Sequence, residues 1–581
     1  MKARFFSAVF FFSLSAVLGF SLPRAEASQD QAALKILEEI PVQHAGRVKP
    51  FQGFAREAVL YVTGKSVYGK MPVSELVWHW IADPEKWNTK PLIPVSYKPL
   101  KQEFGVMLVD GRLSPELALN YEPFVQKVRE AGQKRARKDT LTELEKKRLE
   151  VYERAVFFRD VAEGNSPGWV AHPEEPRAGW LPLESVLSDE GQKVLEQFYT
   201  PEKVQPLRSS LTALLESVKK EGVQSAAPSA KAFAAALRDL FASRSVFLDQ
   251  AVIDKENFYY RVHPFNFAWM FYLASFALSL TFSLMAAGRE TNGGAAGKVL
   301  SAFSIALFCA GFLVHAGGFY LRCAIAGRPP VSNMYESMIW VSWAVALFAL
   351  ILDAVYRNSF IRNTAALVAA VTLLLAEKFP VALNPAISPL VPVLRSNLWL
   401  TVHVLTITMS YGAFLLAWGL GHVVVFTYAF QPSQLERQRG LSQYLYRTLQ
   451  IGVVLLAAGT ILGGVWANYS WGRFWGWDPK ETWALIALLG YLAVLHGRFS
   501  GWIGNFGIAV GSVAAFLGVL MAWYGVNFVL AAGLHSYGFG GGGLPYVLTV
   551  CAVDFVIIGI VAGIAKKRMK NIRKETVSAR D

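Results

Sequence analysis

Nine apolar segments in the latter part of the chain restrict its fold more than any other feature of the sequence. An α-helix needs about 20 residues to cross the hydrocarbon core of a bilayer, and most of these segments approach that length. Three are shorter, which leaves the count open by one or two. The pattern predicts an all-α polytopic membrane protein with about nine transmembrane helices, over Phe265 to Ala287, Val299 to Tyr320, Tyr335 to Val355, Thr364 to Leu375, Leu398 to Phe430, Ile451 to Val465, Thr482 to Leu495, Ile508 to Phe528 and Leu544 to Ala565.

The composition supports this class of protein. Of the 581 residues, 53% are hydrophobic and only 17% are charged, which is too apolar for an ordinary soluble enzyme of this size. The net charge of +14 would suit a nucleic-acid-binding protein, but many of the cations lie in short loops beside apolar segments, where they orient a membrane protein. We therefore expect no nucleic-acid partner.

The three cysteines do not form a redox or zinc motif. Cys309 and Cys551 lie within apolar segments, Cys323 lies near a loop, and the sequence contains no CxxC pair. The chain itself is therefore not expected to be a dithiol reductant or a zinc ribbon.

The N-terminus has the features of a secretory signal peptide over residues 1–27. Lys2 and Arg4 precede an apolar run from Phe5 to Leu22, and a small-x-small cleavage site comes next. An uncleaved signal anchor is the alternative, and either one would export the next part of the chain. Residues 28–264 are then an exported, mostly helical domain, with helices expected near Thr140 to Arg154 and Ser229 to Ser243. Its histidines are scattered, and it shows no catalytic or metal-ligand spacing.

The distribution of cations fixes the expected topology. If the first span is entered from outside, the basic loops and the tail from Lys566 to Asp581 lie in the cytoplasm, as the positive-inside rule requires. The outer loops then include Trp466 to Glu481 and Asn527 to Gly543. We expect these two loops and the N-terminal domain to share one side of the membrane.

Between Trp466 and Trp483 the chain has five tryptophans in eighteen residues. The sequence from Asp478 to Glu481 predicts a helix start, with Asp as N-cap, Pro at the first helical position and Glu reaching back. This explanation needs no ligand. An aromatic belt at the bilayer surface would account for one or two of the tryptophans, so we favour a platform for a planar ligand.

Three histidines are candidates for iron ligation because of their positions. His403 lies one turn inside the outer end of the fifth span, and His535 lies in the outer loop after the eighth. Two imidazoles from opposite faces make a six-coordinate haem, although a lone histidine in a membrane helix is more often a packed residue. His496 lies roughly 25 Å further down its helix, near the cytoplasmic face, and polar residues at such depth are functional candidates.

These motifs, in this order and topology, resemble the CcsA family (also called ResC) of haem-handling proteins of cytochrome c biogenesis. The resemblance covers about Phe265 to Lys574, which we take as a CcsA-like transmembrane domain, and the tryptophan-rich WWD loop is residues 466–483. It depends on the segments WGRFWGWDPKETWALI, LWLTVHVLTITMSYGAF, YLAVLHGR, NFVLAAGLHSYGFG and RPPVSNMYES.

The resemblance implies a set of haem contacts. His403 and His535 would ligate the iron at the exported face, and the WWD loop would hold the ring, with contacts from Trp466, Trp471, Trp475, Trp477 and Asp478. His496 would bind a second, intramembrane haem, whose other ligand normally comes from CcsB (ResB). We recognise no CcsB transmembrane set in this chain, so that ligand comes from a separate partner or from His422 or His315.

The resemblance also implies the function. We expect a multi-pass protein of the bacterial inner membrane, with a periplasmic N-terminal domain and WWD loop and a cytoplasmic C-terminus. It would deliver haem b, as cargo, and present it for covalent attachment to the CxxCH motif of apocytochrome c. It would act by positioning, as a haem lyase subunit with no catalytic residue of its own, beside a CcsB/ResB-like protein and a thiol-reducing partner.

Two other functions stay open at this point. One is a haem exporter without attachment activity, and the other is a b-type haem electron carrier. Arg473, Arg322 and Arg328 lie in outer loops and are candidates for pairing with haem propionates, although anchoring at the bilayer interface explains them almost as well.

Overall fold

A computed structural model describes residues 29–172, 179–244, 248–286, 295–390, 397–530 and 543–578. The predicted signal peptide and His535 lie outside these residues. Contacts divide the described residues into an N-terminal unit, which runs to Val262 and includes Ala386–Pro389, and a membrane unit, which comprises His263–Pro385 and the residues from Leu390 onward.

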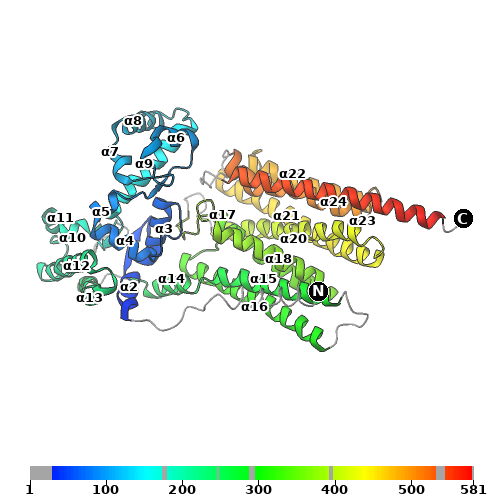
Figure 1. Ribbon diagram of the computed structural model, residues 1–581, viewed down its shortest axis with the longest axis horizontal. Coiled ribbons are helices and arrows are strands. Elements are labelled where there is room, and N and C mark those ends of the chain that lie inside the picture. The colour runs from blue at the N-terminus through cyan, green and yellow to red at the C-terminus, as the bar shows by residue number, and fades with distance from the viewer. Residues whose placement is uncertain are drawn as a thin grey trace. The chain divides into compact units, whose positions relative to one another are not determined.

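The N-terminal unit is mostly helical, as the sequence predicts, and also contains two small antiparallel sheets, which the sequence did not indicate (Figure 1). The larger sheet has the order β2-β1-β5-β6. The helices are α2 (Gln29–Glu38), α3 (Phe51–Thr63), α4 (Val73–Ala82), α5 (Pro84–Asn88), α6 (Lys98–Phe104), α7 (Pro115–Asn120), α8 (Glu122–Ala136), α9 (Glu143–Ala162), α10 (Glu184–Leu187), α11 (Asp189–Leu195), α12 (Pro201–Glu221), α13 (Ala227–Ser243) and α14 (Gln250–Val262). The strands are β1 (Pro41–His44), β2 (Arg47–Pro50), β3 (Ile93–Pro94), β4 (Arg112–Leu113), β5 (Gly168–Val170) and β6 (Leu181–Pro182).

Aromatic side chains form the centre of the N-terminal unit. The rings of Phe51, Trp78 and Trp169 lie with their centroids 5.2 to 5.3 Å apart, and Phe233 of α13 packs against both tryptophans. All four side chains are fully buried. This core brings together strand β5 and helices α3, α4 and α13, which lie far apart in the sequence. The N-terminal unit therefore has a hydrophobic core of its own.

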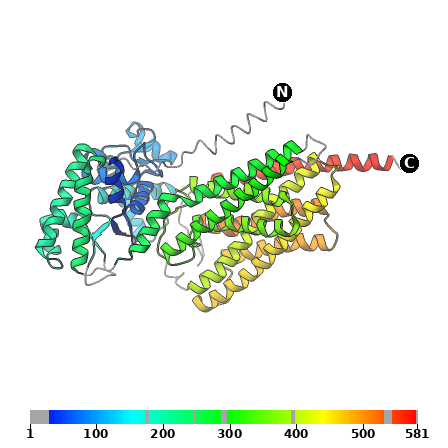
Figure 2. The same cartoon turned by 90° about the horizontal axis from the view of Figure 1, so that it is seen from below.

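The membrane unit is a bundle of long helices (Figures 1 and 2). Within the described residues, nine helices are long and apolar enough to cross a membrane. The predicted all-α polytopic fold is therefore confirmed. The elements are α15 (Pro264–Ala286), α16 (Ala295–Ala326), α17 (Met334–Tyr356), α18 (Ser359–Lys378), α19 (Asn397–Trp399), η4 (Leu400–Val404), α20 (Leu405–Phe430), α21 (Leu435–Trp471), α22 (Pro479–Phe499), α23 (Asn505–Leu520), η5 (Met521–Leu530) and α24 (Leu544–Ser578).

Helix α20 is central in this bundle and packs against α17, α18, α21, α23 and α24. Two of its glycines meet close neighbours, since a Cβ at Gly412 would lie 2.6 Å from the Ala344 Cβ and one at Gly421 would lie 3.0 Å from the Ala509 carbonyl oxygen. Small residues of this kind let membrane helices approach closely.

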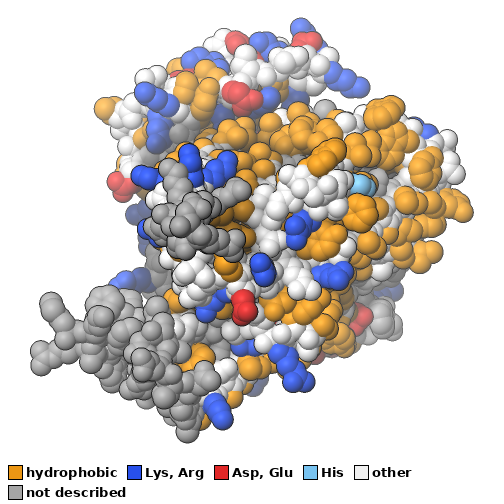
Figure 3. All heavy atoms as spheres, turned by 90° about the vertical axis from the view of Figure 1, so that its right-hand side faces the viewer, with side chains coloured by type: hydrophobic (Ala, Val, Ile, Leu, Met, Phe, Trp, Pro, Cys, Tyr) orange, Lys and Arg blue, Asp and Glu red, His pale blue; other side chains and the backbone are white. Residues whose placement is uncertain are grey.

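The outer surface of the bundle is apolar. Figure 3 shows hydrophobic side chains over much of one face, and the exposed residues of α24 include Val550, Val556 and Ile560. A hydrocarbon environment would cover such a surface, whereas a soluble protein rarely exposes one of this extent.

Candidate functional site

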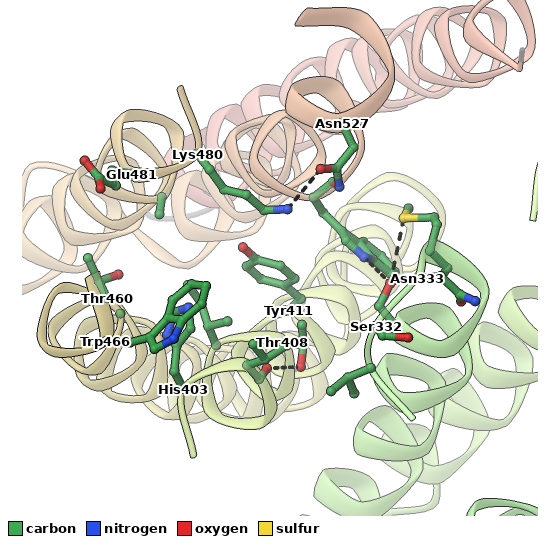
Figure 4. Close-up of a pocket in the computed structure, with 18 of the residues that line it drawn as sticks. Ser332, Asn333, His403, Thr408, Tyr411, Thr460, Trp466, Lys480, Glu481 and Asn527 are labelled. Carbon is green, nitrogen blue, oxygen red and sulfur yellow. Dashed lines mark hydrogen bonds between the residues drawn. The ribbon is translucent and has the colours of Figure 1, made fainter. Parts of the chain in front are cut away.

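A cavity opens within the membrane unit (Figure 4). The cavity has an open mouth and about 150 Å³ of space for water-sized molecules. Its lining comes from five separate stretches of the chain, within residues 331–337, 403–411, 460–466, 475–484 and 523–528. The start of α20, the end of α21 and the start of α22 therefore meet at one place.

His403 is held at the wall of this cavity by its own hydrogen bond. It lies in η4, a π-helical turn that leads directly into α20. Its Nδ1 lies 2.8 Å from the carbonyl oxygen of Gly459 in α21. Because a carbonyl only accepts, Nδ1 carries the proton in this bond, and the lone pair of the neutral ring is on Nε2. Metal-binding histidines are commonly held in this tautomer by a carbonyl oxygen that accepts from the other ring nitrogen.

Aromatic rings enclose the His403 side of the cavity. The indole of Trp466 is stacked on the imidazole, with centroids 5.9 Å apart and an interplanar angle of 23°. Trp466 is buried, and Trp471 packs against it at 5.1 Å. His403 and Trp466, which the sequence predicts to act together, therefore do lie side by side.

The other tryptophans of the WWD loop differ in position. Trp475 lines the cavity, whereas Trp477 is 69% exposed and contacts Trp475 edge-to-face at 5.9 Å. Trp477 does not itself line the cavity, and neither does Trp471. The structure thus places Trp466 and Trp475 at the cavity wall and the other two tryptophans behind or beside them.

Asp478 and Glu481 form the capping box that the sequence predicts at the start of α22. Asp478 accepts from the Lys480 N–H at 3.0 Å, and Glu481 Oε2 accepts from the N–H groups of Asp478 and Gly476 at 3.1 and 2.8 Å. Arg473 Nη1 donates to the other Glu481 oxygen at 3.2 Å. These bonds fix the WWD loop against the helix, so the role they give Asp478 is to start α22.

The wall opposite His403 carries polar groups inside the bundle. Lys480 Nζ donates to Asn527 Oδ1 at 3.2 Å, and the hydroxyl of Tyr411 lies near them in the cavity (Figure 4). Trp523 Nε1 donates to Ser337 Oγ at 2.9 Å. The sequence analysis assigned no role to any of these five residues, although all but Trp523 lie in segments that it quotes for the resemblance. The available signal was the presence of Asn527 and Tyr411 inside apolar segments.

Two of the three arginines that the sequence suggests for propionate binding form ion pairs with a glutamate instead. Arg322 and Arg328 are buried and donate to the two oxygens of Glu336 at 2.8 and 3.0 Å. Ser332 donates its N–H and its hydroxyl to the same carboxylate. This cluster joins the end of α16 to the start of α17, and neither arginine lines the cavity.

The remaining histidines of the spans lie apart from the cavity. The His496 side chain is exposed, and its Nδ1 is hydrogen bonded to the Leu492 carbonyl of its own helix at 2.8 Å. Both ring nitrogens of His422 have partners, the Trp418 carbonyl at 2.9 Å and Asp554 at 2.8 Å. His315 is fully buried, with Nε2 3.0 Å from the Ile339 carbonyl.

Comparison with known proteins agrees with the position of this cavity. The profile of the cytochrome C assembly protein family matches residues 331–535, which include every lining segment. The cytochrome c biogenesis protein CcsA of Prochlorococcus marinus strain MIT 9303 is 36% identical over 261 residues, 39% of this chain and 81% of that protein. CcsA of strain AS9601 is 36% identical over 250 residues, 37% of this chain and 78% of that protein.

A third relative extends further along the chain. Protein NrfI of Wolinella succinogenes is 29% identical over 509 residues, which is 85% of this chain and 53% of that protein. This stretch is too long to fit in the membrane unit, so it includes part of the N-terminal unit. The chain spans about half the length of NrfI.

Proposed function

The chain belongs to the CcsA family of cytochrome c biogenesis proteins, and from this premise we propose that it presents haem b for covalent attachment to apocytochrome c. A role in cytochrome c assembly follows from the family. The identity of the cargo and the step at which the chain acts are the proposal, and the histidine-bearing cavity is the observation that carries it.

The few metal-binding side chains at the cavity suit an iron ion that is already held by a porphyrin. Among the described residues, no group of three His, Cys, Asp or Glu side chains lies close enough to hold a bare metal ion. A porphyrin supplies four nitrogens, so the protein needs to add only axial ligands. His403 would supply one through Nε2, with Trp466 and Trp475 against the ring, and we propose His535 for the other face.

The chemistry of attachment requires positioning more than catalysis. Each cysteine S–H of a CxxCH motif adds across a vinyl C=C bond of haem, forming one C–S and one C–H bond with no net oxidation. The thiols must stay reduced, which is the task we assign to a thiol-reducing partner. The described lining of the cavity contains no cysteine or activated serine, so the chain would contribute by fixing the haem relative to the thiols.

His496 fits a second, transient haem position on the way to this cavity. Its exposed side chain on α22 is directed away from the interior of the bundle. A CcsB/ResB-like partner could therefore supply the opposite ligand. We favour a partner over His422, because Asp554 and the Trp418 carbonyl already engage both nitrogens of that ring.

The test uses His403→Gly in the full-length chain purified in detergent. We expect the Soret and α bands of bound haem to be lost or shifted, and added imidazole to restore them by occupying the vacated space. Val402→Gly in the same π-helical turn is the control, because it weakens the turn equally but removes no group that lines the cavity. Its spectrum should match wild type.

The same variants separate the competing functions in cells. We expect His403→Gly and His535→Gly to lower covalent cytochrome c strongly. Normal cytochrome c levels in both variants would refute the attachment proposal and favour a haem exporter. A purified wild-type protein whose haem cannot be transferred to an added CxxCH apoprotein would instead indicate an electron carrier.

A further inference from the structure

Few charged groups line the cavity, and they differ in whether an opposite charge is paired with them. Among the described lining residues only Lys480 and Glu481 carry full charges at neutral pH. Glu481 is neutralised by Arg473 and by two backbone N–H groups. The Asp478 carboxylate of the helix cap attracts the Lys480 ammonium but forms no ion pair with it, so Lys480 is the cation of the cavity that can still pair with a ligand.

Lys480 is directed toward a neutral partner. Its Nζ donates to Asn527 Oδ1 (Figure 4). The Asn527 Nδ2 in turn donates to the Trp523 carbonyl at 3.0 Å, which orients the amide. None of the ion pairs found among the described residues includes Lys480. An ammonium has three N–H donors, and Asn527 accepts from one of them.

A cation in this position favours an anionic ligand. Lys480 is partly buried at the start of α22, and removing a charge from water is costly unless an opposite charge compensates it. A carboxylate entering the cavity would form a charge-assisted hydrogen bond with the ammonium, and such bonds are about twice as strong as neutral ones.

We infer that Lys480 is the carboxylate-binding group of the cavity and pairs with a propionate of the haem cargo. The inference rests on the proposed function and adds the orientation of the ring. In haem b the two propionates lie on the edge opposite the two vinyl groups. Anchoring a propionate at Lys480 therefore turns the vinyl edge away from α22, so that the reacting carbons occupy one defined side of the site.

The same geometry makes the outer-loop arginines poorer candidates. Arg322 and Arg328 are buried against Glu336, and Arg473 donates to Glu481. None of the three is among the lining residues. Of the cations considered, only Lys480 has its ammonium in the cavity itself.

The experiment compares two forms of the same cargo. Full-length protein, purified in detergent and freed of haem, is titrated with haem b and with its propionate dimethyl ester, which keeps the ring and the iron but has no carboxylates. The variants are wild type, Lys480→Met and Lys480→Arg. The matched control is Lys298→Met, which makes the same change at an exposed position of α16.

We expect wild type to bind haem b at least about tenfold more tightly than the ester, as the loss of one charge-assisted bond implies. Lys480→Met should lose that preference and bind both forms with similar, weak affinity. Lys480→Arg should keep the preference, and Lys298→Met should match wild type. A Soret band of wild-type shape in haem-loaded Lys480→Met would show that axial ligation is intact.

Two results would overturn the inference and leave the proposed function standing. One is a wild-type protein that binds haem b and the ester equally. The other is a Lys480→Met variant that keeps a tenfold preference for haem b, because the propionate would then pair elsewhere. A wild-type protein that binds neither form would refute the proposed function together with the inference.

Discussion

Gly463 determines how closely α21 approaches the imidazole of His403. A Cβ at this position would lie 2.6 Å from His403 Cε1 and 3.0 Å from Nδ1. Gly463→Ala should therefore displace the ring from the Gly459 carbonyl, at a cost of about 1 to 3 kcal/mol. We expect haem affinity to fall roughly five- to a hundredfold, measured by spectroscopic titration of the purified protein.

The control for this change is Gly490→Ala in α22, where a Cβ would meet nothing within 4 Å. Alanine in open space favours a helix by up to about 1 kcal/mol, so this variant should be slightly more stable and unchanged in its spectrum. Equal haem affinity in Gly463→Ala and wild type would show that the imidazole does not ligate iron from this position.

Glu57 gives the N-terminal unit a defined response to acid. Burial raises its pKa, but His44 and Lys49 outweigh burial and hold the pKa of Glu57 below its ordinary value of 4.5. Lys49 Nζ, which is almost fully buried, donates to both carboxylate oxygens at 2.8 and 2.7 Å. The stabilisation from this group is therefore complete above about pH 4.5 and is lost as the pH falls through the lowered pKa.

Glu57→Gln should remove this acid dependence. At neutral pH the variant leaves the Lys49 ammonium buried without its counter-charge, which costs roughly 3 kcal/mol or more. Hydrogen exchange in peptides from β2 and α3 of the full chain should be faster than in wild type at pH 7. The difference should narrow below pH 4.5, and a difference that stays constant with pH would contradict the assignment.

At the scale of elements, the first turn of α22 offers a test of whether Asp478 has a structural role or binds the ligand. If its main task is to cap the helix, Asp478→Ala should destabilise the first turn by about 0.5 to 2 kcal/mol, and Asp478→Asn should be close to wild type. The Lys480 backbone N–H donates a hydrogen bond to Asp478 at 3.0 Å, so hydrogen exchange at this amide measures the effect directly. Loss of haem in Asp478→Asn with normal exchange would instead assign Asp478 to the ligand.

The helices whose ends differ from the sequence prediction contain charged side chains that have partners on neighbouring helices or loops. The apolar pattern predicts the fourth span as Thr364 to Leu375, yet α18 runs from Ser359 to Lys378. Arg362 and Glu377 look like span ends in the sequence. In the structure Arg362 forms an ion pair with Asp353, and Glu377 accepts a hydrogen bond from the Tyr335 hydroxyl at 2.6 Å. These partners stabilise both charged side chains, so the helix extends past them. Pairing of this kind depends on neighbours that a single sequence does not reveal.

The sixth span is likewise longer than its apolar run. The predicted segment, Ile451 to Val465, lies within α21, which begins at Leu435 and takes up most of the loop expected before it. The polar first turns of this helix bury Gln438 and Ser442, so tertiary packing extends the helix beyond its apolar stretch. The cap at Asp478 was predictable because its signal is local. The meeting of Lys480 with Asn527, 47 positions apart, was not.

At the scale of the whole molecule, the membrane unit has two chemically different ends along α20. His403 precedes the first residue of this helix, whereas near its end Arg568 of α24 donates to the Ala429 carbonyl at 2.7 Å. The helix spans 26 residues, or about 39 Å, so the basic tail of α24 lies a full membrane thickness from the cavity. The positive-inside rule predicts that the tail is cytoplasmic, and on that prediction the cavity would open at the exported face.

Cysteine accessibility tests this orientation. In a chain with its three cysteines replaced by alanine, Thr140→Cys reports on the N-terminal unit and Ser433→Cys on the turn between α20 and α21, and both positions are exposed. A membrane-impermeant maleimide added to intact spheroplasts should label position 140 and spare position 433 until the membrane is permeabilised. The reverse pattern would place the cavity at the cytoplasmic face, where exported apocytochrome c cannot reach it.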